Sequence, residues 1–294
     1  MSRPVHLFVS PHLDDAVFSS PAWLADARRT GARTVVLTLF TSAGVSAAPA
    51  TLARYERRRS EDEAALAVLD AEHIHAGLVD APFRSDRYRS FEGLLFGAID
   101  PHDGVPSQVD ACIADTVARL KPVSVRTTLA VGGHIDHRIT FDAVRRLEHR
   151  LRTIPVTYAE DRPYCLVEGA TAVRLASLGC HGALPCPPCD RFVADLLRAP
   201  YVLHHLPPAC RPRVAACAHH LCTTSARARR TVEAEAVLTP WSLDDAALFL
   251  RAMQAYQSQV DSFFGSVDQA RMLLDRRTAE GRQERAWRMT STRT

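Results

Sequence analysis

Two short polar clusters carry the residue types on which metal-dependent hydrolysis depends. The first, "SPHLDDA", holds His12, Asp14 and Asp15, and the second, "GGHIDHR", holds His134, Asp136 and His137. Catalytic zinc takes three imidazole or carboxylate ligands and leaves a fourth position to water. A nearby carboxylate can act as general base, and another histidine can stabilise the developing tetrahedral species. Helix capping could explain Asp14 or Asp15 alone, but neither His12 nor the second cluster. The pair of clusters therefore predicts a hydrolytic metal site.

The surrounding segments predict elements that bring the two clusters together. "PVHLFVS" and "RTVVLTLFTSAG" are typical of buried strands, with a helix between them that ends near Gly31. The alternation of strands and helices continues to about residue 160, through a strand in "VSVRTTLAV" and a strand-like "IPVTYAED". This pattern predicts a doubly wound, mostly parallel sheet. Each cluster follows a strand directly, so both are expected at the carboxyl edge of that sheet, where ligands bind.

The second half of the chain is less regular in sequence. Between about residues 170 and 235, prolines argue against long elements, and from Thr239 or Ser242 onward a helical pattern returns. Cys186 and Cys189 have the spacing of half a structural zinc site. They could hold a second metal, remain scattered thiols, or form a disulfide or redox pair. The segment could also be a lid that selects the substrate.

Length and composition limit the number of domains, the partners and the location that can be expected. The 294 residues suit one domain spanning 1–294 with an irregular insertion or lid at about 170–235, and the net charge of +3 indicates no nucleic-acid partner. No apolar run approaches the roughly 20 residues of a membrane span, and the N-terminus has no apolar signal-peptide region. We therefore expect a cytoplasmic protein with no membrane partner. A nucleotide-binding Rossmann enzyme is disfavoured, since the first strand–helix turn lacks the Gly-x-Gly-x-x-Gly motif.

The two clusters also carry a family resemblance. "SPHLDDAVFS" together with "GGHIDHR" resembles the PIG-L (LmbE-like) family of metal-dependent N-deacetylases, and "RRRSEDEAALAVLDA", "TYAEDRPY", "AYQSQVDSFFG" and "ERAWR" resemble further family elements. The resemblance implies an α/β, Rossmann-like, mostly parallel sheet flanked by helices. It implies zinc as the cofactor, with iron as the alternative in the cell. It also implies a small N-acylated, sugar-like substrate, and it leaves the oligomeric state open.

The resemblance further implies roles for individual residues. His12, Asp15 and His137 would bind the metal, and Asp14 would be the general base. His134 would stabilise the oxyanion or protonate the leaving amine, and Asp136 would set the orientation and charge of His134. Arg58, three residues before Glu61, would grip a substrate hydroxyl or phosphate, unless both belong to a solvated helix face.

Three positions depart from the family pattern. Leu13 and Ala16 replace the proline and glutamate of its commonest motif, and neither position is a metal ligand in the family. Gly132 stands where some members place a tyrosine that acts as a second oxyanion donor. Here that donor must come from elsewhere or be absent.

The function expected from these observations is hydrolysis of an N-acetyl group on an amino sugar or a conjugate of one, in natural-product or glycan biosynthesis. Two alternatives stay open. The metal site could serve another binding or processing role on the same scaffold, or the cysteines could form the centre of a redox or structural-zinc protein.

Overall fold

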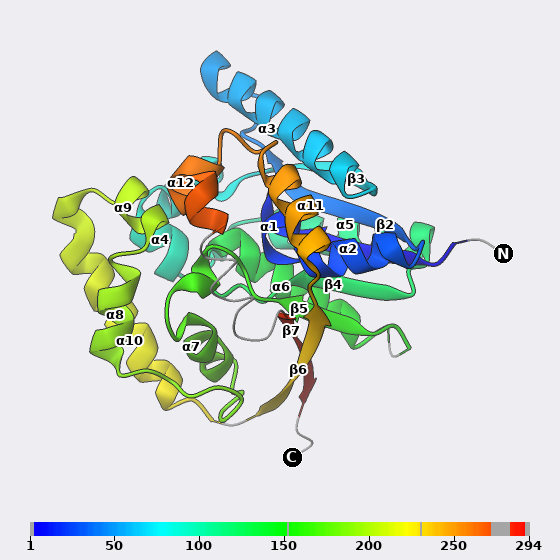
Figure 1. The fold of residues 1–294 in the computed structure, drawn as a ribbon. Coiled ribbons are helices and arrows are strands. Elements are labelled where there is room, and N and C mark those ends of the chain that lie inside the picture. Colours follow the sequence, from blue (N-terminus) through cyan, green and yellow to red (C-terminus); the bar gives the residue numbers. More distant parts are fainter. Residues whose placement is uncertain (1–2, 152, 230, 272–282, 292–294) are drawn as a thin grey trace.

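A single seven-stranded sheet organises the chain. The computed structural model describes residues 3–151, 153–229, 231–271 and 283–291. The sheet order is β3-β2-β1-β4-β5-β7-β6 (Figure 1), and its first five members run parallel. Its strands are β1 (Val5–Ser10), β2 (Arg33–Ser42), β3 (Ala71–Val79), β4 (Ser124–Thr128), β5 (Val156–Ala159), β6 (Val232–Pro240) and β7 (Gln283–Ser291). The predicted mostly parallel α/β fold is confirmed.

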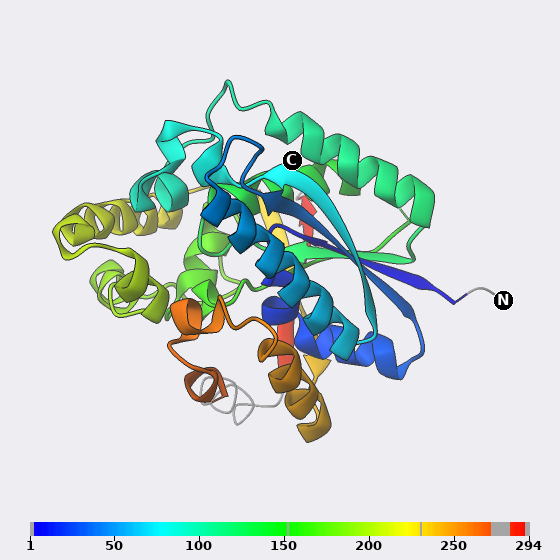
Figure 2. The same ribbon diagram turned by 90° about the horizontal axis from the view of Figure 1, so that it is seen from above.

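Helices connect the strands and cover both faces of the sheet. Those of the first half are α1 (Asp15–Ser19), α2 (Pro21–Arg29), α3 (Pro49–Val68), α4 (Phe91–Phe96), α5 (Val105–Leu120) and α6 (Ile135–Glu148). Those of the second half are α7 (Ala170–Ser177), α8 (Cys189–Leu196), α9 (Pro200–His205), α10 (Arg211–Ala226), α11 (Leu243–Met253) and α12 (Val260–Phe264). Short 3-10 turns lie at Ala81–Phe83, Asp86–Tyr88, Tyr164–Leu166 and Pro208–Cys210. Figure 2 shows α5 on one side of the sheet and α2 and α3 on the other. In the described part of the chain, no helix is long and apolar enough to cross a membrane.

The central strands are apolar at consecutive positions because both of their faces are buried. Leu7 and Val9 of β1 belong to one core, under α5 and α6, whereas Phe8 between them belongs to a second core, under α2, α3 and α11. Successive side chains of a strand point to opposite faces, so a strand covered on both sides needs an apolar residue at every position. Packing on both faces holds β1 and β4 in place in the sheet, and it therefore fixes the positions of the loops that follow these two strands.

The order of the strands places those two loops side by side. β1 lies between β2 and β4, and the chain leaves β1 toward β2 on one side but reaches β4 on the other after β3 and α5. At such a reversal of strand order, the loops at the carboxyl ends diverge and leave a crevice. The two polar clusters follow these two strands.

Three strands escaped the sequence analysis. β3 directly follows α3, and β6 and β7 form an antiparallel pair that joins the sheet through β7 and β5. The pattern after residue 239 predicts only helix, which is wrong for β7. Thr239 lies within β6, whereas Ser242 caps α11 through a reciprocal pair of hydrogen bonds with Asp245.

The expectation of an irregular segment at about 170–235 is also wrong for most of its length. Helices α7 to α10 fill it, and α10 alone spans 16 residues. Pro200 is the first residue of α9 and Pro212 the second of α10. In the first turn of a helix the missing N–H of proline costs nothing, so these prolines start helices instead of interrupting them. The stretch between Leu178 and Pro188 is irregular, as expected.

Candidate metal and active site

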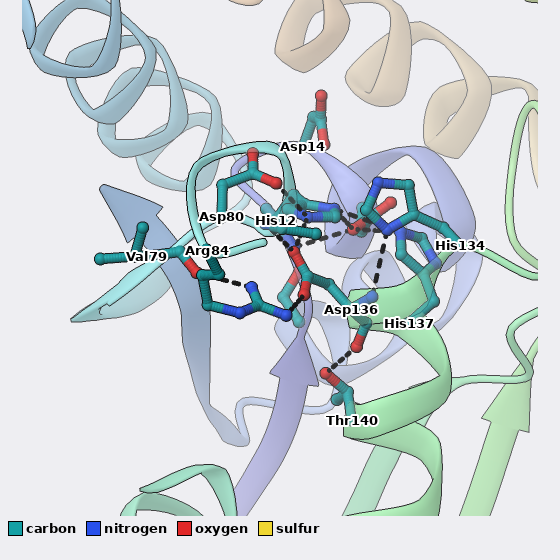
Figure 3. A network of polar contacts seen from close by, with 12 residues as sticks. His12, Asp14, Val79, Asp80, Arg84, His134, Asp136, His137 and Thr140 are labelled. Carbon is teal, nitrogen blue, oxygen red and sulfur yellow. Dashed lines mark hydrogen bonds and ion pairs between the residues drawn. The ribbon is translucent and has the colours of Figure 1, made fainter. Parts of the chain in front are cut away.

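Four strand ends deliver polar side chains to one buried place at the carboxyl edge of the sheet. The loop after β1 brings His12, Asp14 and Asp15, and the turn after β4 brings His134, Asp136 and His137. Asp80 follows β3 and Asp161 follows β5. All eight side chains are buried, and most of them are labelled in Figure 3. The predicted meeting of the two clusters is therefore what the structure shows.

Three of these side chains form a compact triangle of donor atoms. Nδ1 of His12 lies 3.2 Å from Nε2 of His137 and 3.3 Å from Oδ2 of Asp15, and Nε2 of His137 lies 3.2 Å from the same oxygen. Ligands about 2.0 Å from one tetrahedral zinc ion are separated by roughly 3.3 Å. The triangle therefore has the size and the two-nitrogen, one-oxygen composition of a catalytic metal site.

Carboxylates behind the two histidines orient their rings. Nδ1 of His137 donates to Oδ1 of Asp161 at 2.6 Å, which leaves the lone pair of Nε2 facing the triangle. Nε2 of His12 donates to Oδ2 of Asp136 at 3.1 Å, which leaves the lone pair of Nδ1 facing the triangle. A ligand histidine in metal sites is usually held in this way, by a carboxylate on its second nitrogen.

The electrostatics of the triangle favour opposite charges on its members. Burial lowers the pKa of His137, but Asp15 and Asp161 outweigh it and raise that pKa to about 9. Burial raises the pKa of Asp15, but His137 and His12 outweigh it and hold the pKa far below its usual range. The ionised carboxylate of Asp15 therefore faces the ring nitrogens of two histidines. Such a group of electron-pair donors is stable only with positive charge at its centre, from a metal cation or from protons on the imidazoles.

His134 differs from the other two histidines in its charge. Burial, reinforced by His12 and His137, lowers its pKa well below the usual value, so its ring is neutral. Its Nδ1 accepts the backbone N–H of Asp136 at 3.2 Å and caps α6. The proton of the neutral ring is therefore on Nε2, which makes His134 a hydrogen-bond donor at this atom.

Asp14 stands apart from the network of contacts. Its backbone has φ 149°, in a region that non-glycine residues seldom adopt, and its side chain makes no capping hydrogen bond to α1. Among the described residues, its Oδ2 is buried without a hydrogen-bond partner and lies 3.6 Å from Nη2 of Arg58. Burial raises the pKa of Asp14 to about 8, although Arg58 opposes this shift. The capping explanation of Asp14 is thus wrong.

Arg58 belongs to this site and not to a solvated helix face. Its side chain is 12% exposed, and its guanidinium stacks over the ring of Tyr55 at 5.4 Å. Glu61 is also buried, and its carboxylate accepts hydrogen bonds from Ser258. Both residues therefore face inward from α3.

The carboxylate of Asp136 does not set the orientation of His134, contrary to the prediction. Its Oδ2 holds His12 and accepts the N–H of Ala81, and its Oδ1 lies 2.7 Å from Nη2 of Arg84. Asp136 is fully buried at the start of α6, where its backbone N–H is already used by His134. Its side chain therefore reaches His12 of the first polar cluster instead of His134.

Sequence reasoning missed Asp80, Asp161 and Tyr164 as members of the site. Asp80 lies 3.6 Å from Nε2 of His12 and accepts the hydroxyl of Tyr55 at 2.5 Å. Among the described residues, two further groups of possible ligand atoms within 4.8 Å of one another, His12–His134–His137 and His12–Asp80–Asp136, share His12 with the triangle. The three atoms of the triangle lie within 3.3 Å of one another and include the carboxylate that opposes the two imidazoles.

Tyr164 occupies the space that a side chain at residue 132 would fill. A Cβ atom on Gly132 would lie 2.2 Å from Cδ1 of the Tyr164 ring, which in turn packs edge-on against His137. A cavity of about 130 Å³ is lined by residues of the two polar clusters together with Tyr164, Arg58, Arg162, Gln259 and Phe263. A tyrosine is therefore present at this site, but it comes from the segment after β5.

The chain matches known proteins both in sequence and in fold. Residues 7–147 match the family model PIG-L, described as GlcNAc-PI de-N-acetylase. The 2'-N-acetylparomamine deacetylase of Streptomyces fradiae is 31% identical over 205 residues, which cover 67% of this chain and 71% of that protein. The chain belongs to the PIG-L family. The recognition made from the two polar clusters is therefore confirmed.

Solved structures show that the PIG-L fold extends over the whole chain. The zinc-inhibited form of teicoplanin deacetylase Orf2 superposes with a TM-score of 0.67, at 23% identity and with 98% of both chains covered. The A40926 pseudoaglycone deacetylase Dbv21 gives a TM-score of 0.65, at 23% identity and with 100% of both chains covered. The helices beyond the matched family segment, of which sequence analysis predicted only those after Ser242, thus have counterparts in other proteins.

The cysteine pair lies away from the candidate metal site of this PIG-L chain. Cys186 is exposed, and Cys189 begins α8, with its Sγ 3.8 Å from Oγ1 of Thr223. Neither cluster of possible metal ligands in the described residues contains a cysteine. A third thiol, that of Cys222, is close by: burial, a hydrogen bond with Cys189 and the charge of Cys186 raise its pKa to about 12. A second metal at Cys186 and Cys189 stays a prediction.

Proposed function

We propose that this protein is a zinc-dependent N-deacetylase that hydrolyses the acetamido group of an amino sugar. The observation that carries the proposal is the donor triangle of His12, Asp15 and His137 beside the carboxylate of Asp14, whose buried Oδ2 accepts no hydrogen bond from the described residues. The two-nitrogen, one-oxygen donor set suits zinc, and ferrous iron also accepts it. When bound, the metal would polarise the amide carbonyl and make water more acidic.

The protein's own groups would perform the proton transfers. In its ionised form, Asp14 would take a proton from the attacking water and return it to the nitrogen as the C–N bond breaks, which yields acetate and a free amine. His134 would donate its Nε2 hydrogen to the carbonyl oxygen as negative charge develops there. Tyr164, whose pKa burial raises well above its usual value, stays a protonated phenol beside the same cavity and would serve as a second donor.

The surroundings of the site support a polar, sugar-like substrate. The cavity of about 130 Å³ is below the roughly 300 Å³ that encloses drug-sized ligands, so it suits the acetamido end of a larger molecule. Arg58, Arg162 and Gln259 line it and could bind hydroxyl groups. Relatives named for deacetylation of N-acetylparomamine, teicoplanin and A40926 pseudoaglycone support an amino-sugar conjugate from natural-product biosynthesis.

The proposal is tested by assaying acetate and amine release from a panel of N-acetylated aminoglycosides and glycopeptides, with zinc or iron added to metal-free protein. We expect stoichiometric release of both products, and a loss of about 10²–10⁴-fold in kcat for Asp14→Asn. Asp86→Asn, on an exposed side chain, is the matched control. Full activity in Asp14→Asn, or in metal-free protein, would overturn the proposal.

A further inference from the structure

A second and larger cavity lies among helices from both halves of the chain. Helix α10 packs against both α4 and α7 (Figure 1), and a cavity of about 540 Å³ opens between them. Its walls are mainly apolar and include Phe96, Val173, Phe192 and Leu221. Its volume is in the range that holds small organic ligands.

This cavity is separate from the catalytic one. The two have no lining residue in common, and the turn before α6 divides them. Val131 and Gly133 of that turn line the larger cavity, whereas His134 lines the catalytic cavity. A ligand in the larger cavity would therefore contact the turn that carries His134 without entering the metal site.

Two arginines give the apolar cavity a cationic wall. Arg138 and Arg174 both line it, and in the part of the chain that the structure describes neither makes an ion pair within 4.0 Å. Nε of Arg138 is buried without a hydrogen-bond partner among those residues, although its Nη2 donates to the carbonyl of Gly97. Nε of Arg174 donates to the carbonyl of Leu129 at 2.9 Å, and its guanidinium stacks over Phe141 at 4.8 Å.

The nearby carboxylate leaves this wall with excess positive charge. Asp142 faces both arginines, and Asp161 also acts on Arg174 but is already bound to His137. Burial lowers the pKa of Arg138, and it lowers that of Arg174 to about 10 in spite of these acids. One exposed carboxylate near two partly buried guanidiniums leaves an excess of positive charge on this wall that an anion would neutralise.

We propose that this cavity binds an amphipathic carboxylate, with its carboxylate on Arg138 and Arg174 and its hydrocarbon chain along Phe96, Val173, Phe192 and Leu221. Guanidinium groups bind carboxylates through paired, charge-assisted hydrogen bonds, and the buried Nε of Arg138 lacks such a partner. The apolar walls select against small inorganic anions, since these gain nothing from them.

Binding of octanoate to the metal-loaded protein tests the proposal, measured by titration calorimetry in excess acetate. Acetate competes for the catalytic metal but has no chain for the second cavity, so octanoate should still bind. Arg138→Gln and Arg174→Gln should each weaken binding at least about tenfold. Ala216→Trp on α10 should fill the cavity and abolish binding. Ala226→Trp, on the same helix but outside the cavity, should have no effect.

Octylamine and octanol distinguish the contribution of the ligand's negative charge from that of its hydrocarbon chain, because both have the chain but lack the carboxylate. The proposal predicts binding at least tenfold weaker for both than for octanoate. It is overturned if octanol binds as tightly as octanoate, if acetate displaces octanoate, or if Ala216→Trp and Ala226→Trp bind it equally. Should the glutamine variants fail to fold, the two tryptophan variants and the ligand series still decide the question.

Discussion

The carboxylate of Asp161 accepts a hydrogen bond from Nδ1 of His137 at 2.6 Å, and through this bond the segment after β5 orients a ring that the start of α6 carries. Asp161 is fully buried, and its Oδ2 also accepts the backbone N–H of Val131 at 2.9 Å. One side chain thus positions both His137, a proposed metal ligand, and the turn that leads to His134.

We expect Asp161→Asn to weaken metal binding about 10–100-fold, because a neutral amide can no longer fix the ring as a carboxylate does. Competition against a chromogenic chelator measures the affinity directly. Asp190→Asn, at an almost fully exposed carboxylate, is the control and should leave the affinity unchanged. Unchanged affinity in Asp161→Asn would contradict the proposed ligand set.

Gly132→Ala should displace Tyr164, since the new Cβ would lie 2.2 Å from the tyrosine ring. The expected loss is about 1–3 kcal/mol in the free energy of unfolding, typical of overpacking, together with a fall in kcat. Gly104→Ala meets open space and should cost little. Urea unfolding measures the free energy of unfolding of the two glycine variants. In the double variant Gly132→Ala/Tyr164→Ala the clash is absent, so the two losses should not add. Additive losses would contradict the contact.

Glu284→Ala should destabilise the fold by about 3–5 kcal/mol, because it leaves the buried guanidinium of Arg126 without its counter-charge. Glu284 accepts hydrogen bonds from Nη1 of Arg126 and from the backbone N–H of Ala22, both at 2.8 Å. The exposed pair Arg33–Glu72 provides the contrast, and Glu72→Ala should cost less than about 1 kcal/mol. Equal shifts in the urea midpoint for the two variants would refute the argument.

His6 should make folding sensitive to acid. Burial lowers its pKa in the folded protein, where Nδ1 contacts the hydroxyl of Ser124 at 2.5 Å. As the pH falls below about 6.5, the unfolded chain takes up the proton first, so the folded state loses stability relative to it. His6→Asn removes the titration, and the wild type should therefore lose more stability than this variant between pH 8 and pH 5. Parallel losses in thermal melts at the two pH values would contradict this assignment.

The sequence predicts that His12 and His137 come together better than it predicts the carboxylates that hold them. His12 and His137 are recognisable because each belongs to a cluster that directly follows a buried strand. Asp80 and Asp161 are lone acids after strands, and no spacing distinguishes them from ordinary loop residues. Their function depends on sheet order, which brings the ends of β3 and β5 beside those of β1 and β4.

The missed strands have a physical explanation as well. β3 is the edge strand of the sheet, and its sequence "AEHIHAGLV" alternates irregularly because much of it is only half-buried. β7, "QERAWRMTS", contains charged residues that favour a surface assignment. Glu284 nevertheless lies in the interior, because Arg126 on β4 neutralises it. Partners 158 residues apart leave no local signature.

Because β7 lies between β5 and β6, it is an internal strand of the sheet. It also reaches toward the candidate metal site, since Arg285 and Trp287 both donate to Glu160, the neighbour of Asp161. During synthesis, β5 therefore waits for its antiparallel neighbour until residues 283–291 have left the ribosome. A chain cut after residue 282 would lack both that neighbour and the counter-charge of Arg126. We expect such a chain to bind zinc poorly even though it contains every proposed ligand, so metal binding would depend on a strand far from those ligands in sequence.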